Sequence, residues 1–175
     1  LKILGRDTEA REQISLALQL NPYSVVINLV KSASDANNEE YEMAIEGYNK
    51  TLELAIGNTI INQIKFNLTL CYLLSGNNEK AVEYINDLSS TDPTLNSYEF
   101  LDKIYQEAGI EGVGNWFISW LLANKQNKYV NYMTIAQLYS CLGYHQNALK
   151  YLEDAYKNDY IELAFLIRNS DFNAI

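Results

Sequence analysis

Alanine recurs along this sequence at a nearly constant interval, and that interval constrains the fold more than any other feature. The four alanines concerned are Ala10, Ala44, Ala81 and Ala148. They are separated by 34, 37 and 67 residues, the last step being close to twice the first. Tyr72 and Gly76 also recur after 67 residues, as Tyr139 and Gly143. A period near 34 residues is typical of stacked helix–turn–helix repeats, so the sequence predicts an all-α repeat array.

Two segments carry a residue pattern that resembles the tetratricopeptide repeat, which runs Trp-x2-Leu-Gly-x2-Tyr, then Ala-x3-Phe, then Pro. The first segment shows the pattern at Leu68, Tyr72, Gly76, Ala81, Ile85, Leu88 and Pro93. The second segment shows it at Ile135, Ala136, Tyr139, Gly143, Ala148, Leu152 and Ala155. The resemblance implies a right-handed α–α superhelix, that is, a solenoid of stacked antiparallel helix pairs.

The repeat predicts one continuous domain over residues 1–175, divided into units of one helix pair each. We expect these units near 1–22, 23–57, 58–93, 94–128 and 129–160, with a capping helix within 159–175. In the first unit Ala10 and Pro22 fit a second helix whose first helix is missing, which indicates a piece of a longer protein. In the second unit Asp35 stands where the pattern has tyrosine.

Turn residues within the units predict where the helices begin and end. We expect helices over 7–20, 23–36, 39–56, 59–75, 78–90, 95–108, 111–124, 131–142, 144–158 and 159–167. Gly109 is expected to divide the two helices of unit 94–128. No apolar run approaches the ~18 residues of a membrane span, and the sequence leaves the compartment open.

The charge argues against one class of partner. The chain carries 22 acidic and 13 basic residues, a net charge of −9, and the basic residues are scattered. A nucleic-acid-binding surface needs clustered Lys and Arg to neutralise phosphates. Direct contact with nucleic acid is therefore not expected. The acidic excess either solvates the surface or lines a groove for basic peptides.

The resemblance also implies a binding groove, because the first helix of each tetratricopeptide unit lines the concave surface. In unit 58–93 the family spacing places there Gln63, Phe66, Asn67, Leu70 and Leu73. In unit 129–160 it places there Val130, Met133, Thr134 and Gln137. This set holds too little positive charge to clamp a carboxylate. We therefore expect an apolar or amphipathic segment, with amides available for its backbone.

Unit 94–128 departs most from the pattern. Where the second helix should show Ala-x3-Phe, it carries Trp116 and Trp120, four residues apart on one helical face. The rings either fill a core in which the small-residue rule fails or form an exposed aromatic interface.

No motif for catalysis, phosphate binding or metal binding is present, so no enzyme activity, cofactor or metal is expected. His145 is the sole histidine, and we interpret it as a surface residue at a helix start. Cys71 and Cys141 are interpreted as buried free thiols rather than a disulfide.

We interpret the chain as a non-enzymatic protein–protein interaction module that binds a partner peptide or helix. Residues 128–156 and 165–172 resemble the C-terminal repeat region of bacterial multidomain signalling proteins, such as winged-helix transcription regulators, kinases and adenylate cyclases. The resemblance implies the same regulatory context here. Two alternatives stay open: a ligand-sensing regulatory domain of a transcription regulator or cyclase, and a homo-oligomerisation module.

Overall fold

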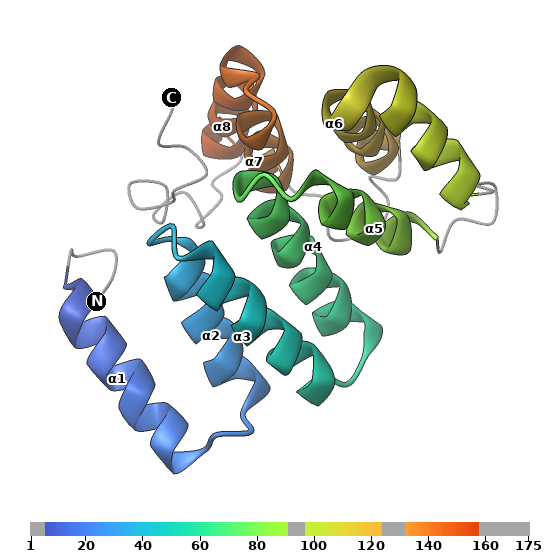
Figure 1. Ribbon diagram of the computed structural model, residues 1–175. Helices are drawn as coiled ribbons and strands as arrows, with labels where there is room; N and C mark the ends of the chain where they lie inside the picture. Colours follow the sequence, from blue (N-terminus) through green and yellow to red (C-terminus); the bar gives the residue numbers. More distant parts are fainter. Residues whose placement is uncertain (1–5, 91–96, 124–131, 158–175) are drawn as a thin grey trace.

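The computed structural model describes residues 6–90, 97–123 and 132–157, and between its turns this part of the chain is helical (Figure 1). The described helices are α1 (Asp7–Leu20), α2 (Val25–Ala36), α3 (Tyr41–Leu54), α4 (Asn58–Leu74), α5 (Asn78–Ser89), α6 (Ser97–Ala123), α7 (Tyr132–Cys141) and α8 (His145–Lys157). The predicted all-α solenoid is confirmed. None of the described helices is long and apolar enough to cross a membrane. The expected capping helix over 159–167 lies outside the described residues.

Polar side chains set two of the helix starts. The Ser24 side chain accepts a hydrogen bond from the main-chain N–H three residues later, so α2 begins at Val25 rather than at the expected Tyr23. The Asn77 side chain does the same for α5. Such caps satisfy N–H groups that the first turn of a helix leaves unpaired.

Two glycines of the repeat pattern occupy the turns inside helix pairs. Gly76 has φ +77° between α4 and α5, and Gly143 has φ +79° between α7 and α8. A left-handed backbone favours glycine because a Cβ atom would be strained there. The turns predicted at these positions are confirmed.

The helices pack as antiparallel neighbours along the chain. The helix α2 packs against α3, α4 against α5, and α7 against α8 (Figure 1). The recurring Ala44, Ala81 and Ala148 are fully buried. A methyl side chain at these places lets two helices approach closely, so the period in the sequence records helix packing.

The helix α6 is bent. Gly109 interrupts it with φ +62° and ψ −161°, between a first arm over 97–108 and a second arm over 110–123. Figure 1 shows the two arms meeting at this bend. The expected division at Gly109 is confirmed, although no loop separates the arms.

The largest buried cluster joins α4, α5, both arms of α6, and α7. Phe117 and Ile118 from the second arm lie in it beside Ile135 and Leu138 from α7. Because α7 also contacts α4 directly, the bent helix does not separate these two helices. This arrangement decides which of the predicted groove residues remain accessible.

Candidate protein-binding surfaces

The groove residues predicted on α4 differ in their exposure. Gln63 is exposed, whereas Phe66, Asn67 and Leu73 are half-buried. Leu70 is only 5% exposed and lies in the cluster shared with α5, α6 and α7. The expectation that Leu70 faces an open groove is therefore wrong, because helices α6 and α7 cover the C-terminal half of α4.

The groove residues predicted on α7 are largely enclosed. Met133 is 6% exposed and packs with Tyr151 and Leu152 of α8, so its expected place in the groove is also wrong. Gln137 is half-buried. Val130 and the side chain of Thr134 lie outside the described residues. The predicted groove is thus reduced to the part of α4 nearer its start.

The two tryptophans of α6 lie against the core with part of each ring exposed. The Trp116 ring meets Phe100 edge-on with centroids 5.8 Å apart. The Trp120 ring stacks on Phe117 at 5.9 Å. These contacts favour a packing role, and an interface at Trp116 and Trp120 stays a prediction.

The sole histidine and the two cysteines belong to no metal site among the described residues. His145 is exposed at the first position of α8, as expected. Cys71 is buried and Cys141 half-buried, and the two do not form a disulfide with each other. Among the described residues, no group of His, Cys, Asp or Glu is arranged to hold a metal ion.

The helix α2 presents an apolar surface that was part of neither the predicted groove nor the predicted tryptophan interface. Val26 is 67% exposed and Val30, one turn further on, is 50% exposed. The same helix buries the polar side chains of Asn28, Ser32 and Asp35. The usual distribution, with apolar residues inside and polar residues outside, is therefore partly reversed in α2.

Local bonds explain how α2 buries polar groups. The Asn28 amide donates to the main-chain oxygens of Pro22 and Ser24, at 3.0 and 2.9 Å. The Asp35 carboxylate lies 2.6 Å from the Lys31 ammonium. Because these groups are paired, their burial costs less free energy than the burial of unpaired polar groups would. The valines are left on the outer face.

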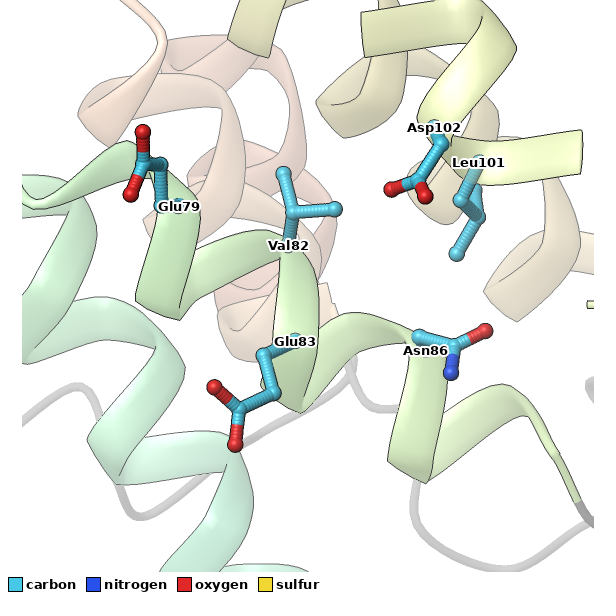
Figure 2. Close-up of a pocket in the computed structure, with 6 residues that line it drawn as sticks. All are labelled: Glu79, Val82, Glu83, Asn86, Leu101 and Asp102. Atoms are coloured by element: carbon cyan, nitrogen blue, oxygen red, sulfur yellow. The ribbon is translucent and has the colours of Figure 1, made fainter. Parts of the chain in front are cut away.

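A pocket lies between α5 and the first arm of α6 (Figure 2). Its volume is about 280 Å³, and its lining residues are Glu79, Val82, Glu83, Asn86, Leu101 and Asp102. The four residues from α5 stand at positions i, i+3, i+4 and i+7 and so share one face of the helix. Below, this site is called the acidic pocket.

Comparison with protein families matches residues 130–160 to the tetratricopeptide repeat. That segment includes the whole of α7 and α8. This segment is similar to a tetratricopeptide repeat, and the all-helical fold of the described residues agrees with one. Tetratricopeptide repeats are protein-interaction modules and are typically non-catalytic. Comparison with curated proteins gives no match.

The tetratricopeptide spacing could have predicted the apolar surface on α2. Val26 and Val30 precede Gln63 and Asn67 by 37 residues, which is also the step from Ala44 to Ala81. The same rule that selected residues on α4 would therefore have selected the two valines. No comparable signal existed for the acidic pocket, because its α6 residues come from the unit that departs from the pattern.

Proposed function

We propose that this tetratricopeptide array is a non-enzymatic module that binds a protein segment on a surface shared by α2 and α4. Val26, Val30, Gln63 and Asn67 define this surface, called the α2–α4 face below. The observation that carries the proposal is the exposure of two valines at repeat positions equivalent to Gln63 and Asn67. Helices α2 and α4 contact each other, which supports a surface shared by the two helices.

The chemistry of the α2–α4 face fits an amphipathic segment. Exposed valines gain free energy when an apolar side chain covers them. The amides of Gln63 and Asn67 each offer both a donor and an acceptor, which suits a peptide backbone. A partner helix with apolar residues three or four apart, or an extended strand, would match this combination.

We further propose that the module belongs to a bacterial signalling or regulatory protein. The support is the resemblance of residues 128–156 and 165–172 to the C-terminal repeats of such proteins. In that setting, partner binding on the array would regulate an attached effector domain.

The proposal is tested by site-specific crosslinking in cells that express the intact protein. A photoreactive residue at position 26 should capture a specific partner, which is then purified. Val26→Asp and Val30→Asp should each weaken binding of that partner by about 1–3 kcal/mol, because a carboxylate would enter an apolar contact. Ile56→Asp is the matched control, since Ile56 is also an exposed apolar residue but precedes α4 in a turn.

Unchanged affinity in both valine variants, with helicity retained, would reject the α2–α4 face. Capture of a second copy of the same chain, with loss of dimer in Val26→Asp, would instead favour the homo-oligomerisation alternative.

A further inference from the structure

Asn86 on α5 has a buried amide that lacks hydrogen-bond partners. Its side chain is 2% exposed, and neither Nδ2 nor Oδ1 finds a partner in the described part of the chain. Buried polar groups in folded proteins are nearly always paired, because an unpaired group loses its bonds to water without replacement. Asn86 also lines the acidic pocket, and Figure 2 shows its side chain on the α5 side of that pocket.

The mouth of the pocket carries excess negative charge. Glu79, Glu83 and Asp102 are exposed around it. A cation at the mouth is Lys80, whose Nζ lies 2.6 Å from Glu83 in an exposed pair. Exposed pairs of this kind contribute little, so Lys80 is easily displaced. Three carboxylates at the mouth favour a cationic ligand.

Part of the pocket wall is apolar, and the pocket is small. Val82 and Leu101 are buried side chains that contribute to the lining. Sites for drug-sized molecules are about 300–1,000 Å³, so about 280 Å³ suits one long side chain with its backbone. The methylene stem of Lys or Arg packs on apolar walls while its charged end reaches polar groups.

We propose that the acidic pocket binds a lysine or arginine residue of a partner polypeptide. The cationic end supplies donors for the carboxylates and for Asn86 Oδ1, while a main-chain carbonyl supplies an acceptor for Asn86 Nδ2. A free polyamine has donors only and leaves Nδ2 unpaired. The proposal rests on the array being a protein-binding module, but it concerns a different surface from the α2–α4 face.

The test uses nuclear magnetic resonance of the whole 175-residue chain with small capped amino acids. Nα-acetyl-lysine and Nα-acetyl-arginine N-methylamides should shift the Asn86 side-chain amide and the Val82 methyl resonances. Saturation is expected at about millimolar concentration, as for ligands of this size. Nα-acetyl-norleucine N-methylamide, which lacks the charge, should bind at least tenfold more weakly.

Variants then assign the binding to the pocket. Glu83→Gln and Asp102→Asn should each lower the affinity for Nα-acetyl-lysine N-methylamide, the lysine probe, at least threefold. Raised salt should lower this affinity further. Asn86→Leu should abolish the shift at Val82. Glu53→Gln, which removes an exposed carboxylate on α3, is the charge-matched control and should bind normally.

Equal binding of the norleucine probe, or equal weakening by Glu53→Gln, would overturn the proposal. Spermidine that shifts the Asn86 amide as strongly as the capped amino acids would overturn the assignment to a polypeptide. Val26→Asp should leave the lysine probe unaffected, so failure of the α2–α4 face and failure of the acidic pocket are distinguishable.

Discussion

At the residue scale, the contact between α2 and α3 depends on the absence of a Cβ atom at Gly47. A Cβ atom at Gly47 would lie 2.4 Å from Ser32 Oγ and 3.3 Å from Ser32 Cβ. Ser32 is fully buried, and its hydroxyl donates to the Asn28 carbonyl oxygen at 2.9 Å. Glycine inside a helix normally lowers its stability, so its presence at 47 reflects packing rather than helix preference.

Gly47→Ala should therefore destabilise the protein by about 1–3 kcal/mol in urea unfolding, since overpacking outweighs the gain in helix propensity. Ser32→Ala removes the closest atom and should recover part of the loss in the double variant. Additive losses in the double variant would contradict the proposed clash.

Tyr84 makes stability sensitive to alkaline pH. Its ring stacks on Tyr72 at 5.6 Å, and its hydroxyl donates to Asn49 Oδ1 at 3.2 Å. Burial, and to a smaller extent Tyr72, raises the pKa of the Tyr84 phenol above its usual value of 10.0. The unfolded chain thus ionises first, so stability is complete below about pH 10 and falls as pH rises through the folded pKa.

Tyr84→Phe should lower the free energy of unfolding by about 0.5–1.5 kcal/mol at neutral pH, because the hydrogen bond to Asn49 is lost. Between about pH 9 and 11, its unfolding free energy should decline less steeply than that of the parent protein. Tyr156→Phe, at an exposed position of α8, serves as the control. Parallel declines in Tyr84→Phe and the parent would refute the role of Tyr84.

At the scale of the element, the bend in α6 depends on one residue. The φ of +62° with ψ −161° at Gly109 belongs to a region that side-chain-bearing residues avoid. A Cβ atom there would meet nothing within 4 Å, so any penalty arises from the backbone alone.

Gly109→Ala should cost about 1–3 kcal/mol in thermal or urea unfolding, as the chain either strains at the bend or straightens. Gln106→Ala, at an exposed position of the first arm, should have little effect. Stability equal to the parent protein would mean that the bend does not require glycine.

At the scale of the whole molecule, stability should be uneven along the array. The largest clusters of buried side chains lie between α3 and α7. By contrast, α1 packs chiefly on α2 and exposes Leu16 and Leu20. In a repeat array each unit is supported mainly by its neighbours, so weakly supported helices open first.

Amide hydrogens of α1 should thus exchange at least tenfold faster than those of α4, measured by mass spectrometry on the intact chain. Equal protection of the two helices would show that the array unfolds as one cooperative unit.

The sequence by itself determined the helix pairs and their closest contacts. The spacing of Ala44, Ala81 and Ala148 predicted the buried positions, and Gly76 and Gly143 predicted the turns. These features depend on neighbours within one helix pair, so local pattern is sufficient to identify them. The equivalence of Val26 with Gln63 was present in the same spacing, although exposure at position 26 became visible only in the structure.

Only the tertiary structure decided which faces stayed open. Leu70 is buried because the second arm of α6 and helix α7 pack into the cluster that covers α4, whereas Met133 is buried against Tyr151 and Leu152 of α8. The acidic pocket, with Asn86 inside it, forms where Asp102 meets α5. The contact of α7 with α4 joins units that are distant in the chain, and no residue period specifies it.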